Sequence, residues 1–160
     1  MSSTIYHLEM LSSSKLNPSV IKPGFEFEEI RDPAESSRLY RDVGSAWEWV
    51  DRLPWSLEAW KNWVKRPEVL TWRVFFEGRE AGYVEVERQA EGSVEIVYFG
   101  LLPEMIGKGL GGGMLTLAVK RIWELEGTKR VWLHTCTEDH PAAKANYEKR
   151  GFRLFRVEEE

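Results

Sequence analysis

The sequence predicts a single-domain α/β protein built on a mixed β-sheet. Apolar and polar residues alternate with a period of two in several short segments, as they do in half-buried strands. After residue 109 the period changes to that of an amphipathic helix. The expected order is a strand, two helices, three strands, and then helix, strand, helix and strand. This order differs from the regular βαβ alternation of a doubly wound fold.

Length and composition agree with one globular domain. A chain of 160 residues can bury roughly 68–70% of its unfolded surface. Hydrophobic residues make up 42% and charged residues 30%, which is ordinary for a folded protein. The net charge of −4 argues against nucleic-acid binding, because such binding depends largely on cationic contacts to phosphate.

Several classes of protein are excluded. The single cysteine, Cys136, rules out an internal disulfide, and three histidines leave little for a zinc site, so we expect no metal. No apolar run approaches the roughly 20 residues of a membrane helix. The first fifteen residues lack the basic start and apolar stretch of a secretory signal. We therefore expect a cytoplasmic protein without membrane contact.

Residues 1–24 are expected to form an N-terminal strand and a connector. Thr4 to Met10 alternates loosely, and residues 12–24 are rich in Ser, Pro and Lys. Phe25 to Ile30 alternates strictly and predicts a strand. An N-cap acid, a proline and a glutamate then follow at residues 32–35, and they predict a helix from residue 33 into the forties.

A tryptophan-rich segment, residues 47–63, comes next. Within it, Ser56 can cap a helix that continues to about Lys65 and is stopped by Pro67. Three strand-like runs follow and predict an antiparallel meander. These runs are Leu70–Glu77, Glu80–Gln89 and Ser93–Leu102.

The last third of the chain predicts two helices and two strands. Both helices are followed by a glycine, a common terminator. The three glutamates at 158–160 are expected to be a solvated acidic tail. The expected elements are the helix Leu110–Leu125, the strand Arg130–Thr137, the helix Pro141–Arg150 and the strand Phe152–Val157.

The most specific local feature is a glycine-rich loop, residues 106–113, between the longest strand and an amphipathic helix. Glycines let the backbone approach a ligand closely, and a helix N-terminus presents unpaired N–H groups. The loop therefore predicts a phosphate cradle, to which Lys108 can add a positive charge. It is not a Walker loop, because Leu102 occupies the first glycine position and Gly109 replaces the Ser or Thr.

The same loop fits the dinucleotide pattern G-x-G-x-x-G at Gly107, Gly109 and Gly112. That pattern should follow its strand directly and open a series of βαβ units. Here residues 103–106 intervene and an antiparallel meander precedes the loop, so this interpretation is the weaker one.

The loop and the strand before it resemble the GNAT acetyltransferase superfamily. The pyrophosphate-binding loop of that family reads [Q/R]-x-x-G-x-[G/A], and Gly109 and Gly111 match its last two positions. Ile106 stands where the family usually has Gln or Arg. The run Phe99–Pro103 resembles the segment whose backbone pairs with the pantetheine arm of acetyl-coenzyme A.

A second motif lies downstream and resembles the family pattern N-x-x-A-x-x-x-Y-x-x-x-G-F. His140 replaces the usual Asn, while Ala143, Tyr147, Gly151 and Phe152 match. Two motifs in the right order are far more specific than one glycine loop.

The resemblance implies a GNAT fold and acetyl transfer from acetyl-coenzyme A, the co-substrate, to an amine. The acceptor stays open between an amino acid, a polyamine, a drug-like amine and a protein N-terminus. A homodimer is plausible because strand edges are exposed. The residues expected to hold the coenzyme are Phe99, Gly100, Leu101, Ile106, Gly107, Lys108, Gly109, Leu110, Gly111, Gly112 and His140.

We expect Glu95 to be the general base. Strict alternation puts it on the same strand face as Val97 and Phe99, where apolar neighbours would raise its pKa toward neutral. The position also matches the glutamate that some family members use. Glu85 and Glu87 on the preceding strand are alternatives.

We expect Tyr147 to be the general acid, because the family places a tyrosine near the thiol sulfur. A phenol with a pKa of about 10 can protonate a thiolate. His134 is a minor candidate base, and Cys136 is expected to be a buried small residue.

The tryptophans at 47–63 are interpreted first as packing residues. Trp47, Trp49 or Trp55 could instead hold a cationic amine by cation–π contact, with Glu48 and Asp51 adding charge complementarity. This second interpretation would place part of the acceptor pocket in the segment.

Two other functions compete with acetyl transfer. The changes at Ile106 and His140 motivate a catalytically silent acyl-coenzyme A sensor or interaction module of the same fold. The glycine pattern motivates a dinucleotide-dependent oxidoreductase.

Overall fold

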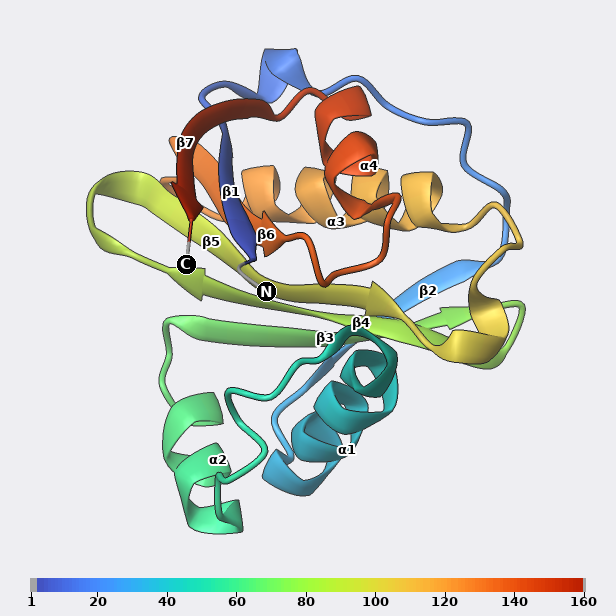
Figure 1. Cartoon of the computed structure of the whole chain (residues 1–160), viewed down its shortest axis with the longest axis vertical. Helices are drawn as coiled ribbons and strands as arrows, with labels where there is room; N and C mark the ends of the chain where they lie inside the picture. The colour runs from blue at the N-terminus through green and yellow to red at the C-terminus, as the bar shows by residue number, and fades with distance from the viewer. Residues whose placement is uncertain (1–2, 160) are drawn as a thin grey trace.

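The computed structural model describes residues 3–159, which form one seven-stranded mixed sheet with helices on both faces (Figure 1). The strands are β1 (Thr4–Met10), β2 (Phe25–Ile30), β3 (Val69–Phe76), β4 (Arg79–Arg88), β5 (Ser93–Leu101), β6 (Arg130–Cys136) and β7 (Arg153–Glu159). The helices are α1 (Pro33–Gly44), α2 (Leu57–Val64), α3 (Gly111–Glu124) and α4 (Ala143–Lys149). Helices α1 and α2 lie on one side of the sheet, and α3 and α4 lie on the other. The predicted fold class is confirmed.

The strand order is β2-β3-β4-β5-β6-β1-β7. Strands β3 to β5 form the predicted antiparallel meander, β2 extends it by pairing with β3, and β6 joins β5 in parallel. Strand β1 lies between β6 and β7 and is antiparallel to both. The first and last strands of the chain are therefore neighbours, which alternation alone could not reveal.

The end of the chain departs from the prediction. Glu158 and Glu159 belong to β7 and not to a tail outside the sheet, because β1 supplies their backbone partners, although both side chains still reach solvent. Glu160 lies outside the described residues.

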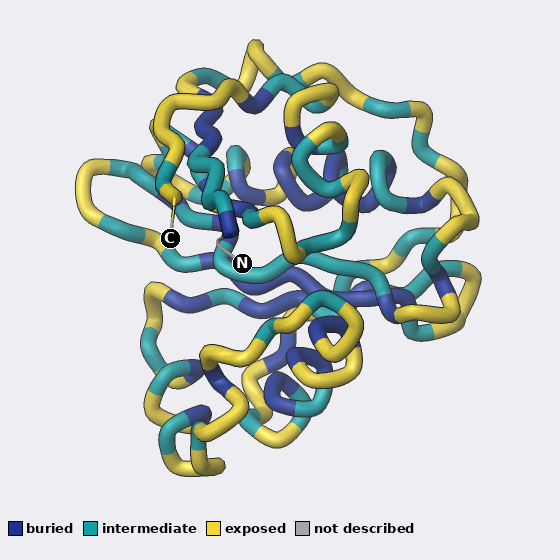
Figure 2. The backbone as a smooth tube through the Cα atoms, in the orientation of Figure 1, coloured by how far each residue is buried: buried dark blue, intermediate teal, exposed yellow. Residues whose placement is uncertain are grey.

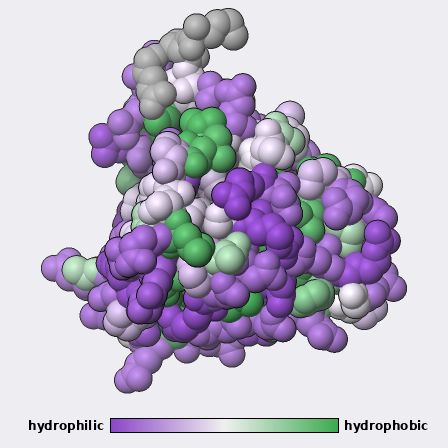
Figure 3. Space-filling view, turned by 90° about the horizontal axis from the view of Figure 1, so that it is seen from below, coloured by the Kyte–Doolittle hydropathy of each residue, from purple (hydrophilic) through white to green (hydrophobic). Residues whose placement is uncertain are grey.

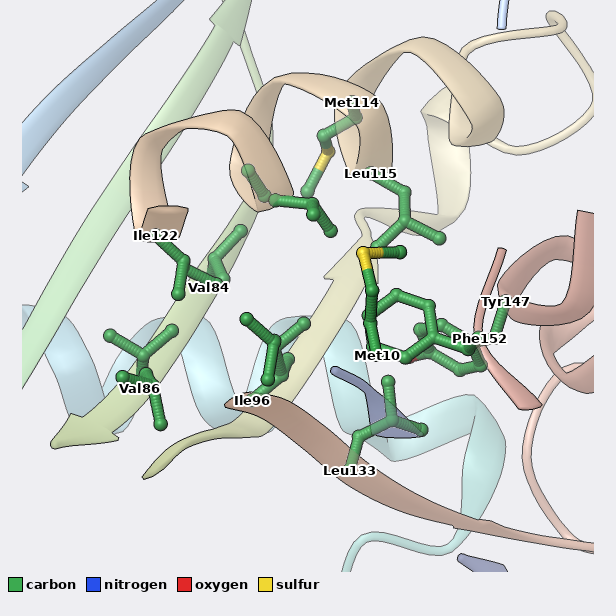
Figure 4. Close-up of a cluster of buried hydrophobic side chains, with 14 of the residues drawn as sticks. Met10, Val84, Val86, Ile96, Met114, Leu115, Ile122, Leu133, Tyr147 and Phe152 are labelled. Atoms are coloured by element: carbon green, nitrogen blue, oxygen red, sulfur yellow. The ribbon is translucent and has the colours of Figure 1, made fainter. Parts of the chain in front are cut away.

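The two largest of three apolar clusters hold the layers together, and they account for much of the buried backbone in Figure 2. The larger cluster lies between the sheet and α3, where Met114, Leu115 and Ile122 meet residues of β1, β4, β5 and β6 (Figure 4). The smaller cluster lies under α1 and α2 and includes Tyr40 and Trp60. Seen from the side of α1 and α2, the surface is mostly hydrophilic, with small separate apolar patches (Figure 3).

The predicted helix starts are confirmed by their caps. The side chain of Asp32 accepts a hydrogen bond from the backbone N–H of Ala34 at 2.9 Å, and Pro33 opens α1. The Ser56 hydroxyl accepts from the N–H of Ala59 at 3.1 Å at the start of α2. Each cap satisfies an N–H group that the helix leaves unpaired.

An irregularity in β5 changes which residues share a face. Glu95 is opposite Glu87 and Ile96 is opposite Val86, but the next pair joins Tyr98 to Glu85, so Val97 has no partner on β4. Such a bulge reverses the alternation beyond it. Glu95 therefore shares its face with Tyr98, and the expectation that it shares a face with Phe99 is wrong.

Strands β5 and β6 separate beyond a short parallel contact. Their pairing runs from Ser93 with Arg130 to Glu95 with Trp132 and stops there. Residues 96–101 of β5 continue without a partner on the β6 side. Their backbone groups on that edge are free to pair with a ligand, because a strand edge presents unpaired N–H and C=O groups.

No helix in the described part of the chain is long and apolar enough to cross a membrane.

Candidate active site

The gap between β5 and β6 leads into a cavity of about 550 Å³. Its walls come from β5, β6, the N-terminus of α3, α4 and residues 47–51 of the α1–α2 loop. The cavity therefore joins the two sequence motifs to the tryptophan-rich segment, which lie far apart in the chain.

The glycine loop forms one end of the cavity. Gly107 and Gly109 have φ of +84° and +75°, in the left-handed region that favours glycine. Helix α3 begins at Gly111 with no side-chain cap at Leu110. The first backbone N–H groups of α3 are thus available to an anion, and they stand at the positive end of the helix dipole.

Two cations that sequence reasoning missed lie beside this loop. The Lys22 ammonium donates a hydrogen bond to the Lys108 carbonyl oxygen at 2.7 Å. A Cβ atom on Gly112 would lie 2.7 Å from the Arg150 guanidinium and 2.8 Å from the Ser19 hydroxyl, so both side chains lie directly against Gly112. The Nε of Arg150 is buried without a hydrogen-bond partner among the described residues. An anion at this end would meet both the helix N-terminus and nearby positive charge.

Most of the predicted coenzyme-binding and catalytic residues line this cavity, but three do not. Gly100 faces away from the cavity and toward α1, because a Cβ atom on it would lie 2.5 Å from Val43 and 3.4 Å from the Trp49 ring. Lys108 is exposed outside the cavity wall. Glu95 does not line the cavity either. The predicted residues that do line the cavity are Phe99, Leu101, Ile106, Gly107, Gly109, Leu110, Gly111, Gly112, His140 and Tyr147.

His140 has a local structural task. Its Nδ1 accepts a hydrogen bond from the Ala142 backbone N–H at 2.9 Å, and its ring packs on Trp47 at 4.9 Å between centroids. The ring thus shapes the start of α4 as well as the cavity wall. Asn146, also on the wall, donates to the Gly111 carbonyl oxygen at 3.2 Å and ties α4 to α3.

Glu95 has the environment that a general base requires. Burial raises the pKa of its carboxyl to about 7, and the nearby carboxylates of Glu87 and Glu85 act in the same direction. The Gln89 side-chain amide donates to Glu95 Oε1 at 3.0 Å and opposes the rise. Glu95 Oε2 lies 3.8 Å from the Nε2 of His134, which does line the cavity.

The two alternative bases are engaged elsewhere. Glu85 is fully buried and accepts two hydrogen bonds of 2.7 Å from the Arg52 guanidinium. Burial raises the pKa of Glu87, but hydrogen bonds from Gln89 and Arg66 outweigh it and leave the pKa below its usual value. Neither carboxylate is placed to take a proton from a ligand.

The Arg52–Glu85 pair was not predicted. The guanidinium carbon lies within 4.6–5.1 Å of the ring centroids of Trp55, Trp60, Trp63 and Tyr98. Trp55 is therefore a packing residue around an internal cation. Nothing in the sequence pairs residue 52 with residue 85, because the contact depends on how the α1–α2 loop crosses the sheet.

Tyr147 reaches the cavity from α4 with its ring packed between Phe99 and Phe152. Figure 4 shows it beside Phe152 at the edge of the apolar cluster. Burial raises the pKa of its phenol above the ordinary value, so the hydroxyl stays protonated at neutral pH.

Asp139 organises the opposite end of the cavity and was also missed. Its carboxylate accepts hydrogen bonds from the Trp49 indole at 3.1 Å, the Thr135 hydroxyl at 2.6 Å and the Cys136 backbone N–H at 3.0 Å. It joins the α1–α2 loop to the loop after β6. Trp47, Glu48 and Asp51 line the same end.

His134 and Cys136 both line the cavity from β6. Burial, and then the nearby His7, lower the pKa of His134, so it is neutral at neutral pH and can accept a proton. Burial raises the pKa of the Cys136 thiol, which disfavours a nucleophilic thiolate. Within residues 3–159, no three His, Cys, Asp or Glu side chains come together as a metal site.

Comparison with known proteins places this geometry in a family. The model of the acetyltransferase (GNAT) family matches residues 29–152. A GCN5-related N-acetyltransferase from Sphaerobacter thermophilus has a TM-score of 0.71 and 17% identity, over 99% of this chain and 51% of that one. Another from Kribbella flavida has a TM-score of 0.68 and 18% identity, over 96% of this chain and 55% of that one.

An aminoglycoside acetyltransferase from an uncultured soil metagenomic sample, solved in complex with sisomicin, has a TM-score of 0.61 and 14% identity, over 79% of this chain and 87% of that one. At these identities, the three similarities show a shared fold. The chain spans about half the length of the first two structures. No curated protein is significantly similar in sequence. Because the family model covers well over half of the chain, the protein belongs to the GNAT acetyltransferase family, whose general reaction is acetyl transfer from acetyl-coenzyme A.

Proposed function

We propose that the protein transfers the acetyl group of acetyl-coenzyme A to a primary amine by direct attack. The observation that carries the proposal is the single cavity that joins the α3 N-terminus, the open edge of β5 and the surroundings of Glu95. The glycine end fits a pyrophosphate, the free strand edge fits an amide-containing arm, and the far end fits an amine.

The coenzyme would be held mainly by backbone groups. The N–H groups of Gly111 and Gly112 would bind pyrophosphate, with Lys22 and Arg150 replacing the charge that Ile106 lacks. The backbone of residues 99–101 would pair with the pantetheine arm. When bound, acetyl-coenzyme A supplies a reactive thioester at the gap between β5 and β6.

Glu95 would accept the proton of the incoming ammonium, directly or through a water molecule. A carboxyl with a pKa of about 7 is half ionised near neutral pH, which suits a base that must both take and release a proton. Tyr147 would donate a proton to the departing thiolate, since its phenol stays protonated.

The acceptor end favours a cationic amine over a neutral or anionic one. Three carboxylates line it, those of Glu48, Asp51 and Asp139, together with the rings of Trp47 and Trp49. Among the described residues that line the cavity, the one Lys or Arg is Lys149 on α4. Small-molecule amines and a protein amine both satisfy this chemistry.

A silent acyl-coenzyme A sensor is the second candidate. The observation that favours it is that Glu95 does not line the cavity, whereas His134, whose Nε2 lies 3.8 Å from the Glu95 carboxylate, does. A sensor would bind the coenzyme without ever acetylating an amine.

The deciding experiment is calorimetric titration with acetyl-coenzyme A, with NAD as the control, followed by thiol release with a panel of amines. Binding of acetyl-coenzyme A alone, followed by thiol release that depends on an amine, is the expected result. Binding without release from any amine would favour the sensor. Binding of NAD alone would overturn both proposals.

A further inference from the structure

Four titratable side chains form a continuous row on one face of the sheet. They are Glu95 on β5, His134 on β6, His7 on β1 and Glu158 on β7, and these four strands are neighbours in the sheet. His7 and His134 are direct cross-strand partners. The row exists only because β1 inserts between β6 and β7.

The contacts along the row are close. His134 Nε2 lies 3.8 Å from Glu95 Oε2, and the His134 and His7 ring centroids are 5.7 Å apart. His7 Nε2 is hydrogen-bonded to Glu158 Oε1 at 2.6 Å. A small rotation of the His134 ring would close the 3.8 Å gap, and a bridging water would join the two rings. The row runs from the half-buried carboxyl of Glu95 to a carboxylate that is 41% exposed.

Aromatic packing fixes the histidines in place. The His7 ring stacks near Trp132 at 6.4 Å and meets the edge of Phe155 at 5.9 Å. The Trp132 indole donates to the Gln89 side-chain oxygen at 2.9 Å, and the Gln89 amide donates to Glu95. This hydrogen-bonded unit supports Glu95, and its Trp132 ring also lies 6.4 Å from the His134 ring between centroids.

The charged groups that surround the row either face one of its members or are paired with one another. Glu95 faces Glu87, Glu85 and Arg52, and His134 faces Asp51 and Asp139 as well as His7 and Glu158. The other charged side chains that reach this face are paired: Arg156 with Glu158, and Arg130 and Arg153 with Glu9.

We propose that His134, His7 and Glu158 carry the proton that Glu95 removes from the acceptor amine out to solvent. This inference rests on the proposed function. An ammonium and a thioester give an amide, a thiol and one proton, so one proton must leave the site in each turnover. The N–H bond breaks as the Glu95 O–H bond forms, and the same proton then moves to His134, to His7 and to Glu158. His134 faces the cavity, so a bound acceptor covers its direct route to water and leaves the route through His7.

His134 and His7 act through Glu95: they receive the proton that Glu95 has taken up, and they are positioning residues in this sense. Their test therefore needs readouts that loss of packing alone would not change. The chain has three histidines, so each ring resonance in an NMR titration can be assigned from its own glutamine variant. His140 packs against Trp47 outside the row and serves as the internal reference.

The NMR experiment needs no turnover. His7→Gln should raise the pKa of His134 by about half a unit or more, since a positive neighbour is lost, and Glu95→Gln should change it less, because the Glu95 carboxyl is largely protonated in the pH range where His134 titrates. His140 should not move in either variant. If the His134 titration is unchanged in both variants, the row does not share protons and the proposal is wrong.

The kinetic experiment uses any amine that the protein acetylates. At low buffer concentration His7→Gln should lower kcat by about 3- to 10-fold, and added imidazole should restore it by carrying the proton instead. Phe155→Leu, which changes the packing of His7 but removes no titratable group, should show no dependence on imidazole. Full activity of His7→Gln in dilute buffer would also overturn the proposal. If no amine is acetylated, the proposed function fails, and the NMR result still decides whether the four groups share protons.

Discussion

At the scale of single residues, Glu95 determines the expected pH dependence. Its pKa is raised to about 7, mainly by burial, and only the carboxylate can accept a proton. The ratio kcat/KM should therefore rise about tenfold per pH unit below pH 7 and level off above it. Glu95→Gln should remove this rise and lower kcat by at least about 100-fold. A variant that keeps both the rise and the rate would exclude Glu95 as the base.

Tyr147 supports a second prediction at this scale. Tyr147→Phe keeps the ring that packs between Phe99 and Phe152 but removes the hydroxyl. Turnover should fall by about tenfold or more, while calorimetric affinity for acetyl-coenzyme A changes little. Unchanged turnover would remove Tyr147 from the mechanism and leave it as a packing residue of α4.

Arg150 supports a third prediction at the scale of single residues. Its guanidinium lies against Gly112 with an unpartnered buried Nε, so it is placed to meet a phosphate at the α3 N-terminus. Arg150→Met should weaken acetyl-coenzyme A binding by about 10- to 100-fold, because a charged hydrogen bond contributes about 1.5–3 kcal/mol. Arg153→Met is the matched control, since Arg153 is exposed and pairs with Glu9 on the sheet. Equal affinities of the two variants would contradict this assignment.

At the scale of elements, local patterns in the sequence were sufficient for most boundaries. Caps at Asp32 and Ser56 and glycines after the helices are local signals, so they appear in the sequence itself. The bulge at Val97 was not predicted, because it depends on the register between β4 and β5. For the same reason the face of Glu95 was assigned wrongly beyond that point, although its raised pKa was anticipated.

The α1–α2 loop is the element whose structure the sequence revealed least. Its conformation depends on Arg52, whose guanidinium is held by Glu85 and four aromatic rings. Arg52→Met should destabilise the fold by about 3–5 kcal/mol, because Glu85 would remain buried without its partner. Adding Glu85→Leu should recover much of that loss in urea unfolding. If the double variant is no more stable than Arg52→Met, the ion pair is not the reason for the loss.

At the scale of the whole molecule, the site is assembled from residues at both ends of the chain. Lys22 comes from the connector, His7 from β1, and Arg150 from the end of α4. The two family motifs locate the coenzyme end of the cavity because they are contiguous in sequence. Lys22 reaches the coenzyme end from the connector, and Asp139 reaches the opposite end by bonding Trp49; both are long-range contacts that no spacing rule describes.

The same topology makes β1 an integral part of the sheet and not an appendage. Leu8 is fully buried, is the cross-strand partner of Leu133 on β6, and belongs to the larger apolar cluster. Leu8→Ala should therefore cost about 2–5 kcal/mol, as a core truncation does, and Leu133→Ala should cost a similar amount. Val20→Ala, at a connector residue that is 91% exposed, should change stability by no more than about 0.5 kcal/mol.

Urea unfolding followed by tryptophan fluorescence and by circular dichroism measures all three variants. If β1 is integral, Leu8→Ala shifts one cooperative transition that both probes report together. If β1 were a detachable strand, Leu8→Ala would resemble Val20→Ala, and the transition would keep its midpoint. That second outcome would also separate His7 from His134, because the two histidines are held together only by the pairing of β1 with β6.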